Sequence, residues 1–130
     1  MILVKHMMLT NVITVSPNMP VKDVIEIFYS KHIGCVVLVD EEKKCIGIFT
    51  ERDAIRLVAQ NVKLDQSMIN VMTKNVITIQ EDSSINEARR TIQTHKTRHL
   101  PVVNQENKLV GLLSVRALQD EFFGINSPTC

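Results

Sequence analysis

The chain has 130 residues and a formal net charge of +1, with 15 Lys and Arg against 14 Asp and Glu. Hydrophobic residues make up 45% and charged residues 22%, which is a globular composition and excludes a disordered chain. No apolar run reaches the length of a membrane span, and no basic excess indicates a nucleic-acid partner. The three cysteines lack paired spacing, so we expect free thiols and a soluble, cytoplasmic protein.

The first half of the chain begins with a short strand and a helix. Residues 12–15 are rich in β-branched side chains, which predicts a strand. Apolar residues at helical spacing from Val21 to Phe28 predict a helix, with Pro20 at its first position. Residues 1–6 have no assigned place, and one interpretation is a helical turn packed on the other half of the chain.

A hairpin and a second helix follow. Residues 35–39 are apolar throughout, which predicts a strand buried on both faces. Residues 45–49 form its partner beyond a polar turn, and a helix follows at about residues 51–60. Residues 60–67 are the predicted linker, and residues 68–72 a helical turn.

The second half repeats the first without a gap. Gly47 recurs as Gly111, 64 positions later, and the runs at 11–15 and 36–40 recur with the same offset. We therefore expect two repeats, residues 1–62 and 63–130. The predicted fold is α+β: two β-α-β-β-α repeats packed sheet to sheet with pseudo-twofold symmetry, which places two equivalent clefts between the halves.

The repeated motifs resemble the CBS (cystathionine-β-synthase) domain. The first copy reads Gly-Cys-Val-Val-Leu-Val-Asp at 34–40 and Gly-Ile-Phe-Thr-Glu-Arg-Asp at 47–53. The second reads Arg-His-Leu-Pro-Val-Val-Asn at 98–104 and Gly-Leu-Leu-Ser-Val-Arg at 111–116. The resemblance implies a stand-alone tandem pair, a Bateman module. It also implies regulatory binding of an adenosine-containing ligand: AMP, ADP, ATP or S-adenosylmethionine.

The resemblance implies that each cleft draws on both repeats. The first cleft combines Thr50 and Asp53 with Ile77, Thr78, Lys96, Arg98, His99 and Pro101. In similar proteins the Asp holds the ribose hydroxyls, the Thr contacts phosphate, and basic residues neutralise the phosphates. A carboxylate can accept from two vicinal hydroxyls, and a guanidinium can hold phosphate bidentately.

The second cleft departs from the family pattern. It combines Ile13, Thr14, Gly34, Cys35 and Val36 with Ser114, Arg116 and Ala117. Ala117 replaces the Asp, and Gly34-Cys35 replaces Arg98-His99. Because both losses fall in one cleft, we expect one adenosyl site and one degenerate site.

Each of these residues also has a plainer interpretation. Thr50 and Asp53 form a capping box with Asp in place of Glu, and Arg98 and His99 fit a solvated strand start. Pro101 fits an edge strand better than a central one, or a wall beside the adenine. The four histidines lack the spacing of metal ligands, so no metal site is predicted.

Three functions remain. The first is a non-catalytic sensor module that acts on a separate effector protein, since no nucleophile–base pair or phosphate loop is present. The second is a structural dimerisation or scaffold module with vestigial clefts, and a third, weaker one is an enzyme acting on a nucleotide. We also expect a homodimer, because apolar helix faces that include Ile25, Phe28, Ile55 and Phe122 have few partners in one chain.

Overall fold

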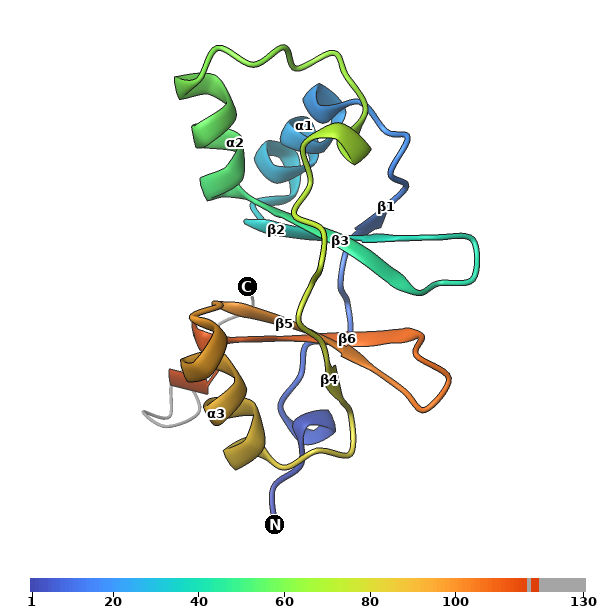
Figure 1. Cartoon of the computed structure of the whole chain (residues 1–130), viewed down its shortest axis with the longest axis vertical. Helices are drawn as coiled ribbons and strands as arrows, with labels where there is room; N and C mark the ends of the chain where they lie inside the picture. Colours follow the sequence, from blue (N-terminus) through green and yellow to red (C-terminus); the bar gives the residue numbers. More distant parts are fainter. Residues whose placement is uncertain (117, 120–130) are drawn as a thin grey trace. The chain divides into compact units, whose positions relative to one another are not determined.

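The computed structural model describes residues 1–116 and 118–119, and these residues form two compact units (Figure 1). Ile13–Val76 form one unit, which we call the first-repeat unit. Met1–Val12 pack with the described residues from Ile77 onward, and we call this the second-repeat unit. The repeats expected at 1–62 and 63–130 are units of sequence, whereas packing divides the chain at different residues. None of the helices in the described residues is long and apolar enough to cross a membrane.

The first-repeat unit is a three-stranded sheet with helices α1 and α2. Its elements are β1 (Thr14–Val15), α1 (Val21–Lys31), β2 (Cys35–Val39), β3 (Cys45–Thr50), α2 (Glu51–Ala59) and the 3-10 turn η2 (Met68–Asn70). The strand order is β1-β2-β3, with β1 parallel and β3 antiparallel to β2. The predicted strand at 35–39 and the predicted helix from residue 51 are confirmed.

The second-repeat unit has the same topology. Its elements are the 3-10 turn η1 (Val4–His6), β4 (Ile79–Gln80), α3 (Ile85–His95), β5 (His99–Val103) and β6 (Leu109–Ser114). The order is β4-β5-β6, again with one parallel and one antiparallel pair. Val115, Arg116, Leu118 and Gln119 are helical, as the repeat of the helix at about residues 51–60 predicts. The α+β class is confirmed.

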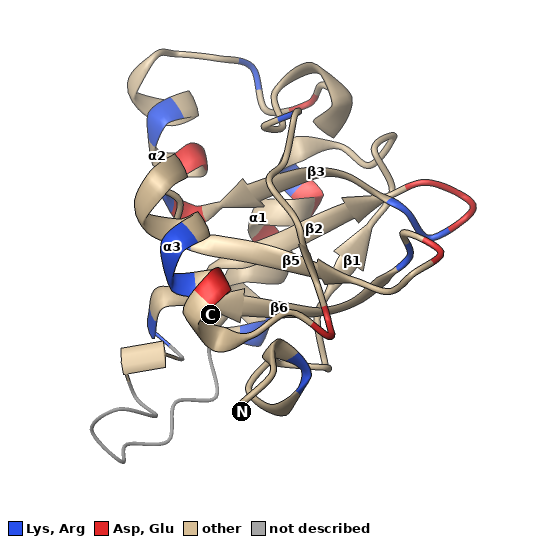
Figure 2. Cartoon of the chain, turned by 60° about the horizontal axis from the view of Figure 1, so that its bottom comes forward, with Lys and Arg blue, Asp and Glu red and all other residues tan. Residues whose placement is uncertain are grey.

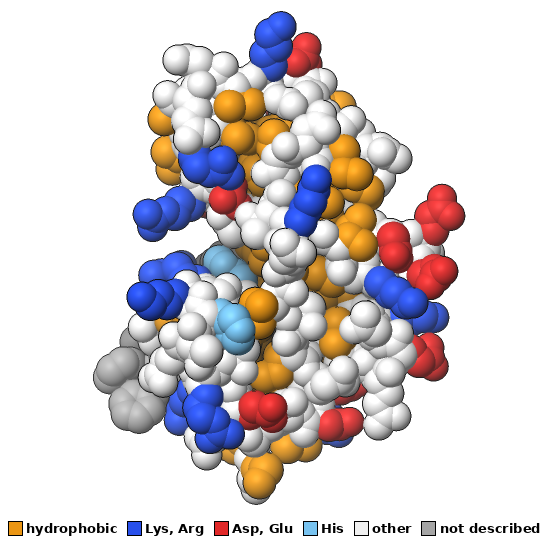
Figure 3. Space-filling view, in the orientation of Figure 1, with side chains coloured by type: hydrophobic (Ala, Val, Ile, Leu, Met, Phe, Trp, Pro, Cys, Tyr) orange, Lys and Arg blue, Asp and Glu red, His pale blue; other side chains and the backbone are white. Residues whose placement is uncertain are grey.

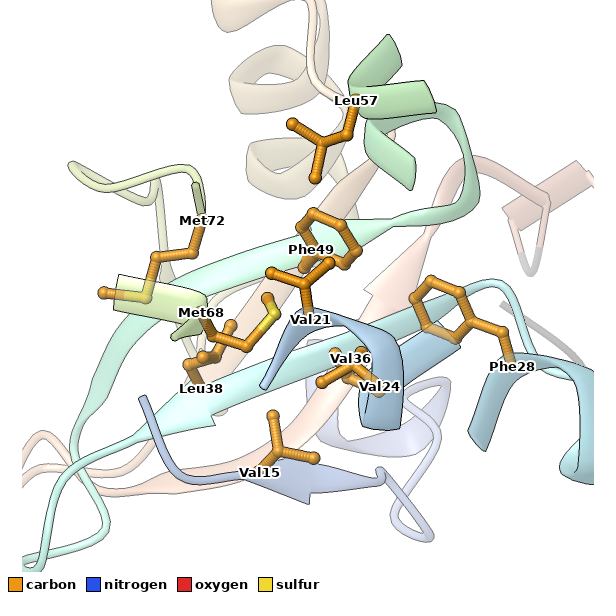
Figure 4. Packing of buried hydrophobic residues seen from close by; sticks show 10 residues of the cluster. All are labelled: Val15, Val21, Val24, Phe28, Val36, Leu38, Phe49, Leu57, Met68 and Met72. Atoms are coloured by element: carbon orange, nitrogen blue, oxygen red, sulfur yellow. The ribbon is translucent and has the colours of Figure 1, made fainter. Parts of the chain in front are cut away.

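Each unit has its own hydrophobic core. In the first-repeat unit, Val24, Val36 and Phe49 are fully buried between the helices and the sheet (Figure 4). Full burial of one such side chain stabilises the fold by about 1.5–3 kcal/mol. Phe28, expected on an unpartnered helix face, is only 7% exposed and stacks on Phe49 with ring centroids 6.0 Å apart. That expectation was wrong because the helical stripe from Val21 to Phe28 faces the core.

Residues 1–12 lead into the first repeat but pack on the second, and residues 68–76 lead into the second repeat but pack on the first. We call them the leading segments. Val4 lies in the core of the second-repeat unit, and its repeat equivalent Met68 lies in the core of the first-repeat unit. Leu9 forms a backbone bridge with Leu112. Thr73 forms the equivalent bridge with Ile48. The interpretation of residues 1–6 as a turn packed on the other half is therefore confirmed.

The linker before the second repeat satisfies backbone donors at the N-terminus of α1. The N–H groups of Val21 and Lys22 donate to the carbonyl oxygens of Gln66 and Leu64 at 2.9 and 2.8 Å. Pro20 is the N-cap of α1, one position before the expected one, and its side chain has no polar atom to cap the helix. Backbone carbonyls of the linker therefore satisfy donors that an N-cap side chain usually satisfies.

Cys45 begins β3, and its half-buried position changes the pKa of its thiol. Burial raises the pKa of its thiol above the ordinary value of 9.0, and the Sγ contact to the Gly47 carbonyl oxygen at 3.8 Å opposes this only in part. The neutral thiol is the form that tolerates the low dielectric of this site. Cys35 is buried, and Cys45 is a free, half-buried thiol.

Candidate functional site

Thr50 and Asp53 form a complete capping box at the start of α2. The Asp53 N–H donates to Thr50 Oγ1 at 3.3 Å, and the Thr50 N–H donates to Asp53 Oδ2 at 3.0 Å. Thr50 Oγ1 also donates to Asp53 Oδ2 at 3.1 Å. The second oxygen, Oδ1, has only a long ion pair at 3.5 Å with Arg56, and the side chain is 20% exposed. The capping interpretation is therefore confirmed, while Oδ1 still has lone pairs available.

The same unit contains five residues that were expected in the second cleft. Cys35 lies opposite Thr50 in the β2–β3 ladder, and the carbonyl of Gly34 accepts from the Glu51 N–H at 3.0 Å. Val36 is buried in the core, so only its backbone is available to a ligand. Ile13 and Thr14 precede and begin β1. The carbonyl of Ile13 accepts from the Val37 N–H at 3.2 Å.

The second repeat has no equivalent of the hydrogen bond between Val37 and Ile13, because Pro101 replaces Val37. Pro101 is the repeat equivalent of Val37, and it has no N–H to donate. Among residues 1–116 and 118–119, no donor is bonded to the carbonyl of Ile77, the equivalent of Ile13. As a consequence β4 begins at Ile79, whereas β1 begins at Thr14, the equivalent of Thr78.

Pro101 also corrects an expectation about the sheet. It lies in β5, the central strand, where it pairs with Leu112, and not at an edge. A proline is tolerated there because β4 begins only at Ile79, so the missing donor of Pro101 lies outside the β4–β5 ladder. Ile77 and Thr78 are half-buried, so this unpaired acceptor lies at an accessible edge of the sheet.

Lys96, Arg98 and His99 lie at the start of β5. Lys96 is the C-cap of α3 in the left-handed conformation, with φ of 52°, and its side chain is exposed. Arg98 is exposed and His99 is half-buried. Thr97 Oγ1 donates to the carbonyl of His99 at 3.0 Å, which holds this short connection in one conformation.

The remaining residues of the second cleft also lie in the second-repeat unit. Ser114 is buried at the end of β6, and Arg116 is exposed in the helical residues after it. Ala117 lies outside the described residues. Each unit thus contains one half of each expected cleft: the first-repeat unit has the Thr50 and Asp53 half, and the second-repeat unit has the Ile77 to Pro101 half.

Sequence reasoning missed two features of these halves. The first is the acceptor on Ile77, for which the signal was a proline at the position of Val37. The second is Glu51, whose Oε1 lies 3.1 Å from where a Cβ on Gly34 would be. The Glu51 carboxylate therefore lies in tight contact with the position where the equivalent of Arg98 would begin its side chain. Its signal was the change from Glu51 to Val115 between the repeats.

Comparison with known proteins identifies the repeat. The family model of the CBS domain matches twice, at residues 4–60 and 68–124. The chain belongs to the CBS domain family. A 17.7 kDa protein of uncharacterised function from Acidianus ambivalens is 31% identical over 109 residues, which are 84% of this chain and 66% of that protein.

CBS pairs similar to this one also occur inside enzymes. Inosine-5′-monophosphate dehydrogenase of Aquifex aeolicus is 36% identical over 110 residues, which are 84% of this chain but 22% of the dehydrogenase. The chain therefore spans less than two thirds of the length of these curated relatives.

Solved CBS pairs share the fold over nearly the whole chain. The CBS domain pair of protein MJ0100, in complex with 5′-methylthioadenosine and S-adenosyl-L-methionine, has a TM-score of 0.85 and 28% identity. The match covers 94% of this chain and 96% of that one. The CBS domain protein PAE2072 from Pyrobaculum aerophilum, complexed with AMP, has a TM-score of 0.83 and 26% identity, with 90% of each chain covered.

Proposed function

We propose that this CBS pair is a regulatory module that binds one adenosine-containing ligand in a cleft to which both repeats contribute. The complexes of similar CBS pairs with AMP, 5′-methylthioadenosine and S-adenosyl-L-methionine support the ligand class. The ligand would change the interaction of the module with a separate effector protein, and the module itself would catalyse no reaction.

The proposed site divides the ligand between the two half-sites. Asp53 would accept hydrogen bonds from the ribose hydroxyls through Oδ1, because Oδ2 already accepts two bonds from Thr50. Arg98 and Lys96 would contact phosphate, because both are exposed cations at the start of β5. Ile77, Thr78 and Pro101 would surround the base, with His99 beside them.

The unpaired carbonyl of Ile77 is the observation that carries the proposal. A half-buried acceptor without a donor is costly unless water or a ligand satisfies it. The exocyclic amino group of adenine is a donor of the required kind, whereas a carbonyl-bearing base presents an acceptor at that position. The acceptor therefore favours an adenine ligand over a hypoxanthine ligand.

The differences between the two repeats also support a single site. The carbonyl of Ile13 is already bonded to the Val37 N–H, and Glu51 occupies the space beside Gly34. The second cleft would thus lack an available acceptor, and its anionic side chain would repel phosphate. We expect one equivalent of ligand per chain.

Calorimetric titration with adenosine and inosine tests this assignment. Pro101→Val supplies an N–H to the carbonyl of Ile77, and we expect the Kd for adenosine to rise about three- to tenfold, the value of one neutral hydrogen bond. Val37→Pro is the matched control, because it frees the carbonyl of Ile13 in the cleft where Ala117 replaces the ribose-binding Asp, and it should add no second site. An unchanged Kd in Pro101→Val would contradict the role of Ile77.

A scaffold module with vestigial clefts is the second candidate, and the complete capping box of Asp53 favours it. A ligand present at about one hundred times its Kd should stabilise the fold by about 2.7 kcal/mol if the sensor function is correct. The absence of any shift in thermal unfolding with adenosine, AMP, ATP and S-adenosylmethionine would favour the scaffold.

A further inference from the structure

Three cationic side chains share one end of the β5–β6 ladder. Lys96 caps α3, Arg98 directly precedes β5, and Arg116 is the second residue after β6. His99 pairs with Ser114, and the Arg98 carbonyl accepts from the Val115 N–H at 3.0 Å, which extends the ladder by one step. Lys96, Arg98 and Arg116 are therefore brought to the same edge, although Arg116 was expected in the other cleft.

Among residues 1–116 and 118–119, Lys5 and Lys108 of this unit form ion pairs, whereas Lys96, Arg98 and Arg116, like Arg89 and Arg90 of α3, form none. Lys5 pairs with Asp82 at 2.9 Å, and Lys108 pairs with Glu106 at 3.6 Å. No acidic side chain among residues 1–116 and 118–119 forms an ion pair with Lys96, Arg98 or Arg116. All three are exposed. Figure 2 marks Lys and Arg positions along the ribbon of α3, and Figure 3 shows Lys and Arg side chains on this side of the unit. Like charges held together repel one another, and a bound anion would relieve that repulsion.

The equivalent edge of the first-repeat unit has a different charge. Its corresponding residues are His32, Gly34 and Arg52, and Glu51 replaces Val115. The Glu51 carboxylate lies against Gly34, and Arg52 is the only cation of the three positions with His neutral. One edge thus carries three positive charges, while the other carries one positive and one negative charge.

We propose that the regulatory ligand is a nucleoside polyphosphate, with two or more phosphates, and that Arg116 is one of its phosphate-binding residues. This inference rests on the proposed function. A monophosphate carries about two negative charges, which Arg98 and Lys96 alone would neutralise. Each further phosphate adds charge that requires a third cation, and the planar guanidinium of Arg116 suits bidentate contact with phosphate. The sulfonium of S-adenosylmethionine is positive and would be repelled here.

Titration of the full chain with adenosine, AMP, ADP, ATP and S-adenosylmethionine tests the inference. We expect the Kd to fall at each added phosphate, and ATP to bind at least about tenfold more tightly than AMP. Arg116→Gln should raise the Kd for ATP about tenfold and leave that for adenosine unchanged. Arg52→Gln, the equivalent change in the first repeat, should alter neither titration, and Arg116→Lys should retain part of the affinity for ATP.

The outcomes separate this inference from the proposed function. AMP or S-adenosylmethionine binding as tightly as ATP, or Arg116→Gln with unchanged ATP binding, overturns the inference but leaves an adenosine sensor in place. Inorganic tripolyphosphate that binds as tightly as ATP also overturns it, because the cations would then be a general anion surface. If none of the five adenosine compounds binds, the proposed function itself fails. Thermal unfolding of each variant verifies that it is folded.

Discussion

The two carboxylate oxygens of Asp53 have different neighbours, and this allows two roles in one residue. Oδ2 accepts from the Thr50 N–H and Oγ1, and Oδ1 has only the long contact with Arg56. Asp53→Ala should weaken binding of adenosine ligands about ten- to a hundredfold, since a charged hydrogen bond contributes roughly 1.5–3 kcal/mol. Loss of the cap should also lower the free energy of unfolding by about 1 kcal/mol. Calorimetry and urea unfolding measure the two effects separately.

Ser84→Ala is the control for that experiment. Ser84 Oγ caps α3 by accepting from the Glu87 N–H at 3.1 Å, and it has no place in the proposed site. Its removal should cost similar stability without a change in affinity. If Asp53→Ala behaves like Ser84→Ala, Asp53 acts only as a helix cap.

Lys96 combines a proposed role in binding with an unfavourable backbone conformation. Its φ of 52° is one that glycine adopts without strain, and a non-glycine residue there costs about 1 kcal/mol or more. Lys96→Gly should therefore raise the free energy of unfolding by roughly 0.5–1 kcal/mol while it weakens nucleotide binding.

His32→Gly is the matched control for Lys96→Gly. His32 is the C-cap of α1 with φ of 54°, and it is the repeat equivalent of Lys96. Its replacement should give the same stabilisation with no loss of affinity. Equal binding by the two glycine variants would remove Lys96 from the site, and measurement of both by denaturant unfolding and calorimetry decides this.

At the scale of elements, each leading segment packs closely against a glycine in the hairpin of the other repeat, Gly111 or Gly47. A Cβ on Gly111 would lie 2.6 Å from Met8 Sδ and 2.8 Å from the carbonyl oxygen of Leu9. For a Cβ on Gly47, the three nearest atoms would all belong to the Met72 side chain, with the closest at 2.5 Å. A flexible methionine side chain can move away, whereas a backbone carbonyl held in a bridge cannot.

Gly111→Ala should consequently destabilise the chain more than Gly47→Ala. We expect a loss of about 1–3 kcal/mol for Gly111→Ala, as for other overpacked sites, and a smaller loss for Gly47→Ala. Limited proteolysis should also cleave the segment before Leu9 sooner in Gly111→Ala. A similar loss in both variants would show that the bridge between Leu9 and Leu112 does not restrain the segment.

The helices and strands also show how much of the fold the sequence alone can predict. The run Cys35–Val39 gave strand bounds that match β2, because an apolar run between polar turns has few alternative structures. The start of α2 was predictable because Thr50 and Asp53 form a local cap. The exchange of leading segments was predicted only as one interpretation of residues 1–6, since residues 1–12 have no periodic pattern, and their partners are distant in sequence. The residues proposed for the site remain a prediction from the sequence, and the free acceptor on Ile77 could not be predicted with them because it depends on pairing between strands.

For the whole molecule, exposed apolar side chains support the proposal of a homodimer. Tyr29 on α1 is 84% exposed, and Ile55 and Val58 on α2 are 69% and 61% exposed. Helices α1 and α2 contact each other, and Figure 3 shows hydrophobic side chains at the surface where α2 lies. Of the residues first expected in the interface, Ile55 is exposed and Ile25 is half-buried, while Phe122 lies outside the described residues.

We propose that this surface of α1 and α2 pairs with the same surface of a second copy. A self-complementary contact closes a twofold dimer and covers apolar side chains that water would otherwise surround. On α3 the position of Tyr29 is taken by Gln93, beside the exposed Arg89 and Arg90, so that face is charged and unsuited to apolar pairing.

Light scattering at micromolar concentration tests the dimer. The wild-type chain should have twice the mass of one chain, and Tyr29→Asp should shift it toward the monomer, because a charge would be buried in an apolar contact. Gln93→Asp is the matched control at the equivalent position of α3, and it should leave the mass unchanged. Dissociation by Gln93→Asp alone would place the contact on α3. A monomeric wild type would show that Tyr29, Ile55 and Val58 bind a different partner or none.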